Sequence, residues 1–163
     1  YQFPGHIDTL GALNIILDLK KHIVPDKIYW LNVNDMDIPF LAVVEHTNFI
    51  SSQNYGQLPL VYIGNYLPTD HEYFGLSASQ LLQKYLAGLK KINPEFSQSW
   101  VNQSWVFKSD YAQSIVTTNF SRKLPPMATD FPGFYIANIQ QVYPWDRGIN
   151  YSLKLGYSVA RYV

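Results

Sequence analysis

The strict alternation of side chains between Ala12 and Leu19 is the feature that most constrains the fold of this chain. Every second residue from Leu13 onward is Leu or Ile, and the residues between them include Asn14 and Asp18. This two-residue period is typical of a β-strand with one well-buried face. We therefore expect a sheet that packs one of its sides against a core.

Further runs rich in β-branched and aromatic residues extend the predicted sheet. They cover residues 27–33, 38–50 and 58–67, and polar, turn-like sequences separate them. Residues 12–67 are therefore expected to form an antiparallel sheet. Strand-like character returns in residues 104–120, before a loop rich in proline.

A helix interrupts this pattern at Ser77, where the period of the apolar residues changes. Ser77 and Gln80 have the spacing of a capping box, and Asn93-Pro94 is a stop signal. Together the elements predict an α+β fold, and a length of 163 residues predicts one compact unit. The apolar face of this helix is predicted to consist of Ala78, Leu81, Leu82, Tyr85, Leu89 and Ile92.

Composition excludes several classes of function. The chain has 12 Lys and Arg against 12 Asp and Glu, so it lacks the positive field that nucleic acids or anionic membranes require. It has no cysteine, and its four histidines lack paired spacing, so no metal site is expected. The absence of cysteine fits a reducing compartment, and we expect a cytoplasmic protein without a membrane span in this piece.

The last 31 residues predict a buried strand at 133–139, a loop, and an amphipathic helix at 148–163. A row of small residues, Ser152, Gly156 and Ala160, would let this helix approach a sheet closely. The face expected to be buried comprises Ile149, Ser152, Leu153, Gly156, Val159, Ala160 and Val163.

The loop before this helix is the strongest candidate for a binding site. The start of the helix leaves N–H groups and a positive dipole end that stabilise a phosphate or an electron-rich ring edge. Arg147 adds charge, Asp146 could cap the helix or accept from a ribose or ribityl hydroxyl, and Gly148 would allow close approach or a positive φ. The alternative is an ordinary corner in which Asp146 and Arg147 pair with each other or with solvent.

Several of these segments, taken in order, resemble a known family. They are similar to the carboxy-terminal half of flavin-dependent oxidoreductases of the amine oxidase and protoporphyrinogen oxidase superfamily, with a distant similarity to UDP-galactopyranose mutases. The segments that carry the resemblance are "YWLNVNDMDIPFLAVVEHTNFI", "YGQLPLVYIGNYLPTDHEYF", "KINPEF", "YAQSIV" and "GFYIANIQQVYPWDRGINYSLKLG".

The resemblance implies an FAD cofactor and two parts of a larger flavoenzyme. Residues 1–130 would hold most of a substrate-binding domain, and residues 131–163 would complete the FAD-binding domain. The glycine-rich amino-terminal part of that domain would be absent from this chain and would be its partner. By position, the flavin contacts fall on Asn138, Asp146, Arg147, Gly148, Ile149 and Asn150.

In the resembling family one face of the substrate-domain sheet lies toward the flavin, which makes His46, Asn48, Tyr62 and Tyr111 the candidate contacts for a small-molecule substrate. Each has a structural alternative, such as a hydrogen-bonded histidine. No catalytic base is assigned, because the flavin carries the redox chemistry. The expected reaction is hydride transfer to flavin. The alternatives are a mutase-like flavoprotein without net redox change, or a non-catalytic binding module. The isolated chain is expected to be inactive.

Overall fold

A computed structural model describes residues 7–162 of the chain, which divide into two units. Residues 9–113 form the first, and the second comprises the described residues 7–8 and 114–162. The expectation of one compact unit was therefore wrong. The boundary predicted at residue 130, and the assignment of the two parts to a substrate domain and an FAD-binding domain, stay predictions.

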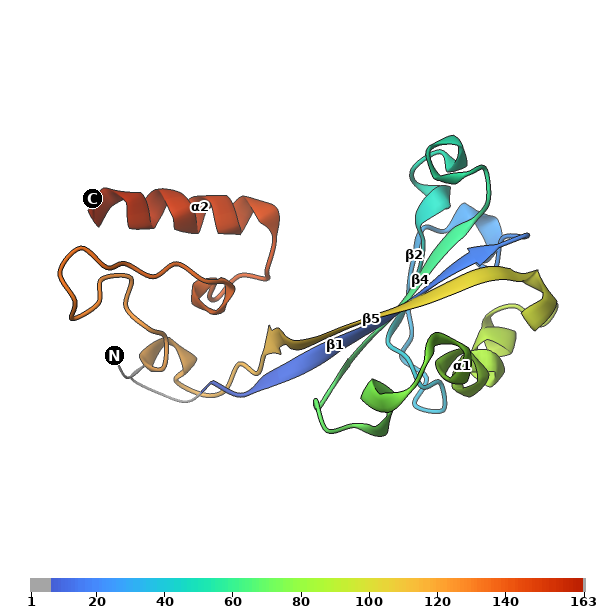
Figure 1. Ribbon diagram of the computed structural model, residues 1–163, viewed down its shortest axis with the longest axis horizontal. Helices are drawn as coiled ribbons and strands as arrows, with labels where there is room; N and C mark the ends of the chain where they lie inside the picture. Colours follow the sequence, from blue (N-terminus) through green and yellow to red (C-terminus); the bar gives the residue numbers. More distant parts are fainter. Residues whose placement is uncertain (1–6, 163) are drawn as a thin grey trace. The chain divides into compact units, whose positions relative to one another are not determined.

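Within the described residues, the first unit is built on a five-stranded sheet with the order β2-β3-β4-β1-β5 (Figure 1). β1 pairs antiparallel with β4, and β3 pairs antiparallel with both β4 and β2, as the sequence predicted. The fold class is α+β. The strands are β1 (Thr9–Leu19), β2 (Trp30–Asn32), β3 (Ala42–Glu45), β4 (Leu60–Leu67) and β5 (Val101–Ser114).

One face of this sheet carries the core. Leu13, Ile15, Leu17 and Leu19 of β1 are fully buried, and Val61 and Ile63 of β4 lie beside them. The helix α1 (Ala78–Ile92) covers this face through Leu81, Tyr85 and their neighbours on the predicted apolar side. Its capping box at Ser77 and its end at Asn93 are confirmed. The alternation of residues in β1 thus indicates a sheet that is covered on one side.

Gly88 lets the chain pack tightly against α1. A Cβ at this position would lie 2.9 Å from Ile38 Cγ2 and 3.0 Å from Phe40 Cε1. Ile38 and Phe40 belong to the segment between β2 and β3, so the missing side chain brings this segment onto the helix. A glycine inside a helix costs about 0.8–1.0 kcal/mol relative to alanine, and the close packing offsets this cost.

A buried carboxylate fixes the turn after β1. Glu45 ends β3 with no solvent exposure, and its Oε2 accepts from the backbone N–H groups of Ile23 (3.1 Å) and Val24 (2.7 Å). Its Oε1 contacts Nδ1 of His22. The strand predicted over residues 38–50 is therefore shorter than expected. It ends where Glu45 turns inward, and a 3-10 turn follows at His46–Asn48.

The second unit departs most from the sequence-based expectations. The strand predicted at 133–139 was wrong, because in the described chain this segment has a single bridge, between Tyr135 and Ala128, and no sheet neighbours. A strand needs a neighbour along its length to pair its backbone groups. The segment ends in a 3-10 turn at Ile139–Gln141, which Asn138 caps.

The predicted carboxy-terminal helix forms as α2 (Ile149–Val159), and a 3-10 turn at Ala160–Tyr162 continues it. Its expected buried face is not buried within the described residues. Ile149 is 82% and Leu153 60% exposed, whereas Val159 is half-buried. Ser152, Gly156 and Ala160 are also exposed, and Val163 lies outside the described residues. The better-covered side holds Tyr151, Leu155 and Ser158.

We predict that Glu45→Ala lowers the free energy of unfolding by about 3 kcal/mol, because two buried N–H groups lose their acceptor. Urea denaturation followed by circular dichroism measures this change. Glu72→Ala is the matched control, since the Glu72 side chain is 65% exposed and contacts only Lys84 among the salt bridges of the described chain. The control should change the free energy by about 0.5 kcal/mol or less. Equal effects would contradict the buried role of Glu45.

We also predict opposite effects for alanine at two helical glycines. Gly88→Ala should destabilise the chain by about 1 kcal/mol or more, because overpacking against Ile38 and Phe40 exceeds the gain in helix propensity. A Cβ at Gly156 in α2 would meet nothing within 4 Å. Gly156→Ala should therefore stabilise α2 by up to about 1 kcal/mol in this chain. Amide hydrogen exchange in each helix distinguishes the two outcomes. Slower exchange of the α1 amides in Gly88→Ala than in the wild type would refute the packing role of Gly88.

Candidate functional site

The open face of the sheet in residues 9–113 is the first candidate site. Side chains alternate across a strand, so the partners of the buried residues point away from α1. Pairing places Tyr62 of β4 between Ile16 of β1 and Val44 of β3, and Trp30 pairs with Val44 in turn. This row is a continuous aromatic and aliphatic surface on the side that α1 does not cover.

Aromatic residues of β5 continue this surface. Val106 packs against the core, and Nζ of Lys108 donates to the carbonyl oxygens of Phe74 and Leu76 at 2.7 Å, so both lie on the helix side. Trp105 and Phe107 alternate with them and are 41% and 57% exposed. Trp105 and Phe107 therefore belong to the open face, a position that the sequence did not predict for them.

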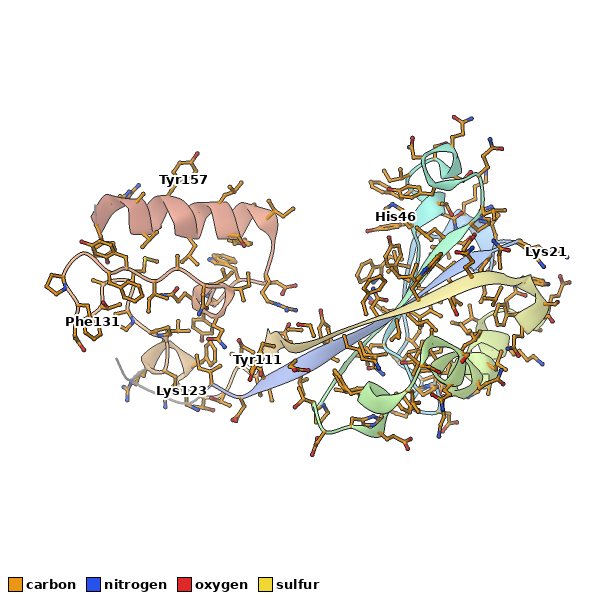
Figure 2. All side chains as sticks on the ribbon, in the orientation of Figure 1. Lys21, His46, Tyr111, Lys123, Phe131 and Tyr157 are labelled. Atoms are coloured by element: carbon orange, nitrogen blue, oxygen red, sulfur yellow. The ribbon has the colours of Figure 1, made fainter. Side chains whose placement is uncertain are left out.

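His46 lies at the end of β3 and joins this face through two tyrosines (Figure 2). Its Nε2 is 2.9 Å from the hydroxyl of Tyr55. The rings of Tyr55 and Tyr62 meet the imidazole edge to face, at centroid distances of 4.9 and 5.7 Å. Glu45 precedes His46 but points into the core, and no carboxylate of the described side chains hydrogen-bonds to this histidine. The cluster can hydrogen-bond and stack on a ligand, and it lacks the partners of a hydrolytic triad.

The structure brings together some of the four predicted substrate residues and separates others. His46 and Tyr62 are in contact. Asn48 is in the same turn as His46, but its Nδ2 donates to the carbonyl of Ile28 at 2.9 Å, so this amide has a structural partner. Tyr111 is 81% exposed on β5 and lies toward the other end of the sheet from His46 (Figure 2).

Asn14 is a polar residue on the open face that the sequence analysis did not single out. It pairs across the sheet with Gly64, and a Cβ at Gly64 would meet nothing within 4 Å. The Oδ1 atom of Asn14 is shielded from solvent and makes no hydrogen bond with any described residue. Buried polar atoms are normally paired, so this amide is a candidate ligand contact. The alternation in residues 12–19 was the signal that could have found it.

The corner before α2 is the second candidate site, and the structure gathers the predicted residues Asp146 to Asn150 there. Oδ1 of Asp146 accepts from the backbone N–H of Arg147 at 2.7 Å, so Asp146 does not cap the helix. The N-cap is Gly148, and no side chain caps this end. Its φ of −167° is extended backbone, so the expected positive φ was wrong.

The side chain of Asn138 makes its hydrogen bonds within its own 3-10 turn and not in the corner before α2. Its Oδ1 accepts from the N–H of Gln140 at 2.8 Å, and its own N–H donates to Gln141 Oε1 at 2.7 Å. The side chain therefore serves the local 3-10 turn.

A small cavity of about 150 Å³ lies beside α2. Trp145 and Tyr151 stack there with an interplanar angle of 5° and a centroid distance of 5.8 Å. The space suits a ring edge or a few solvent molecules and is too small to hold a complete dinucleotide. Its lining consists of Gln141, Val142, Tyr143, Trp145, Tyr151, Lys154, Leu155 and Ser158.

Neither candidate site contains the groups of a metal centre. Among residues 7–162, no cluster of three or more His, Asp or Glu side chains could hold an ion. No helix in the same range has both the length and the apolar composition needed to cross a bilayer.

No family model and no curated protein matches this sequence. Among the solved structures with a similar fold is a protein from Exiguobacterium sp. 255-15 described as "Putative protoporphyrinogen oxidase". The TM-score is 0.67 at 14% sequence identity, and the match covers 96% of this chain and 35% of that one. At this identity the likeness shows a shared fold alone. It gives no support to the similarity to UDP-galactopyranose mutases.

We predict that Asp146→Ala leaves the stability of α2 unchanged within about 0.5 kcal/mol, because Asp146 makes no capping bond to the helix. Ser77→Ala is the comparison, since Ser77 caps α1 in a capping box. Loss of that cap should cost about 1 kcal/mol. Amide exchange at the first turns of both helices measures the two effects, and a cost at Asp146 that matches the one at Ser77 would restore the capping interpretation.

Proposed function

We propose that this chain is part of an FAD-dependent oxidoreductase in which the open face of the sheet binds the substrate and the corner before α2 contacts the flavin. The observation that carries the proposal is the fold likeness, which covers almost the whole chain but only 35% of the similar protein. The remaining part of such an enzyme would supply the glycine-rich dinucleotide-binding segment and is the proposed partner of this chain.

The exposed face of α2 supports a partner in the second unit. Ile149 and Leu153 lie one turn apart and are largely exposed, and Tyr157, one further turn along, is 75% exposed. Exposed apolar stripes of this kind mark surfaces that another element covers. The small residues between them would allow a strand or helix to approach closely, as the sequence analysis expected.

The corner before α2 fits the edge of a flavin or its phosphates. The first turn of a helix has N–H groups without acceptors inside the helix, and no side chain caps them here. Arg147 adds a positive charge next to these groups, and Ile149 offers an apolar surface. Bound FAD would accept the hydride from the substrate. The residues of this chain would then position the flavin and exclude water from it.

The open face of the sheet fits a flat, largely apolar substrate. Trp30, Tyr62, Trp105 and Phe107 supply aromatic surface, and His46 with Tyr55 supplies polar groups at one end. The similar protein is described as a "Putative protoporphyrinogen oxidase", and an amine is the other substrate class of the superfamily. Binding on the open face would hold a C–N or C–C bond of either substrate in position for oxidation by the flavin.

The protein encoded by the complete gene tests this proposal. After purification it should contain FAD, identified by absorbance and by mass spectrometry of the released cofactor. Anaerobic addition of protoporphyrinogen, or separately of primary and secondary amines, should bleach the flavin absorbance of the enzyme that accepts them. A complete protein that neither contains nor binds FAD would refute the proposal. The present chain alone should lose flavin on desalting.

In that complete protein, we predict that Gly148→Val weakens FAD binding at least tenfold, whereas Arg147→Ala weakens it less than about fivefold. A Cβ at Gly148 would lie 2.7 Å from Asn150 Oδ1 and over the start of α2, so a branched side chain displaces Asn150 and blocks the helix end. Loss of a partly solvated charge costs about 1 kcal/mol or less. Flavin fluorescence titration gives both affinities, and thermal melts exclude unfolding. Wild-type affinity in both variants would make the corner merely structural.

We further predict that His46→Ala slows reduction of the bound flavin by substrate at least tenfold while FAD stays bound. Tyr55→Phe removes only the hydroxyl partner of the imidazole, so it should slow reduction less than His46→Ala does. Tyr111→Phe is the test at the other end of the sheet. Stopped-flow absorbance measures the rates, and unchanged rates in all three variants would remove these residues from the site.

A further inference from the structure

A second cavity lies on the opposite side of the sheet from the open face and takes no part in the proposed function. Its volume is about 420 Å³, which falls in the range of small-molecule pockets. The segment between β2 and β3 forms one wall, and β4 with the turn after it forms the other. The lining residues are Val33, Asn34, Asp35, Met36, Ile38, Pro39, Phe40, Leu41, Asn65, Leu67, His71 and Tyr73.

Asn65 is the polar anchor of this cavity. It lies on the helix-facing side of β4, is 8% exposed, and its Nδ2 donates to the carbonyl of Pro39 at 2.9 Å. No described residue donates to its Oδ1, so this oxygen is the group that remains to accept a hydrogen bond. A buried amide with one of its two ends engaged is a fixed acceptor in a lining that is largely apolar.

Tyr85 lies behind this anchor. Its ring packs edge to face on Phe40 and Tyr73, both of which line the cavity, at centroid distances of 5.0 and 6.0 Å. Its hydroxyl is fully buried, and the Asn65 side chain lies close to it without a hydrogen bond of ordinary geometry. Burial raises the pKa of the Tyr85 phenol, and the neighbouring Asn65 side chain offsets part of that rise. Two under-bonded polar groups therefore meet at one point of the core.

His71 presents a hydrogen-bond donor on the other wall. Its Nδ1 accepts from the backbone N–H of Tyr73 at 3.2 Å. In the neutral imidazole this assigns the proton to Nε2. The cavity thus combines an acceptor from Asn65 with a donor from His71, which is the complement of an amide or a hydroxyl group.

The charge of the Asp35 carboxylate does not favour a charged ligand in this cavity. The carboxylate of Asp35 at its edge accepts from the N–H of Asp37 at 2.9 Å and from Lys91 Nζ at 3.0 Å. Its charge is therefore already paired. Aromatic and aliphatic side chains make up most of the remaining lining, and Met36, which is 96% exposed, sits on the segment that borders the opening.

We propose that this cavity is a ligand site for an uncharged small molecule with a flat apolar body and one amide or hydroxyl group. Phe40 and Tyr73 flank the apolar body, Oδ1 of Asn65 accepts from the ligand, and Nε2 of His71 donates to it. Gly88 contributes to the shape of the cavity, because it allows Ile38 and Phe40 to approach α1 closely and so sets the position of one wall. All its residues belong to residues 9–113, so ligand binding can be tested without FAD.

Benzamide is the probe for this site, with toluene, benzoate and benzylamine as comparisons. Amide chemical shifts of the labelled chain should change saturably at residues 33–41, at Leu67 and at residues 71–73 when benzamide is added. Benzoate and benzylamine should bind at least tenfold more weakly, because a charged group would be buried without a partner. No saturable shifts up to the solubility limit of benzamide, or shifts confined to the open face of the sheet, would overturn the proposal.

Asn65→Leu tests the anchor, since leucine has a similar shape and no polar atoms. It should weaken benzamide binding at least tenfold and change toluene binding less than twofold. Asn54→Leu, at an exposed position in the loop before β4, is the matched control and should leave both unchanged. If Asn65→Leu does not fold, Leu41→Trp at the half-exposed wall serves instead, and it should abolish binding of both probes. Benzamide affinity equal to wild type in a folded Asn65→Leu or Leu41→Trp chain would refute the site.

Discussion

One-sided burial of the sheet is the constraint on which the first unit depends. α1 covers the face that carries Leu13 to Leu19, and the tight contact at Gly88 fixes the segment between β2 and β3 against that helix. Glu45 closes the same side by holding the turn after β1 through two backbone N–H groups. These contacts use one face only. The aromatic side chains of the other face stay partly exposed, because no described residues form a core on that side. That surface is the proposed substrate site.

The second unit has the opposite character. Phe120 is its buried aromatic residue among those described, and α2 contributes no buried side chain. Hydrophobic burial is the main favourable term in folding, so the proposed partner would stabilise a segment that buries so little by itself. The fold likeness to a chain almost three times as long agrees with such a neighbour. The two units therefore differ in function within the proposal: one recognises a substrate and the other completes a cofactor site.

Polar groups in the core also divide into two kinds. Glu45 has its oxygens engaged, which makes it a structural residue. Tyr85 and Asn14 each retain a buried polar atom without a hydrogen bond to the described residues, and Tyr85 lies beside Asn65, which lines a cavity. Unpaired buried groups are costly, so they direct attention to places where a ligand would complete the structure. His46, one of the candidate substrate contacts, already has a partner in Tyr55.

The sequence by itself determined the elements whose signals are local. The alternation in residues 12–19, the capping box at Ser77 and the apolar stripe of α1 all follow from spacing along one element, and the structure confirms them. It could not determine the end of β3, because Glu45 turns inward for donors that lie more than 20 residues away. Nor could it exclude a strand at 133–139, since pairing depends on neighbours that the pattern does not contain. Tertiary structure alone decided which polar atoms lack partners, that His46 meets Tyr55 and Tyr62 while Tyr111 lies apart, and that a cavity forms beside Asn65. Each of these depends on contacts between distant segments, which residue periodicity does not encode.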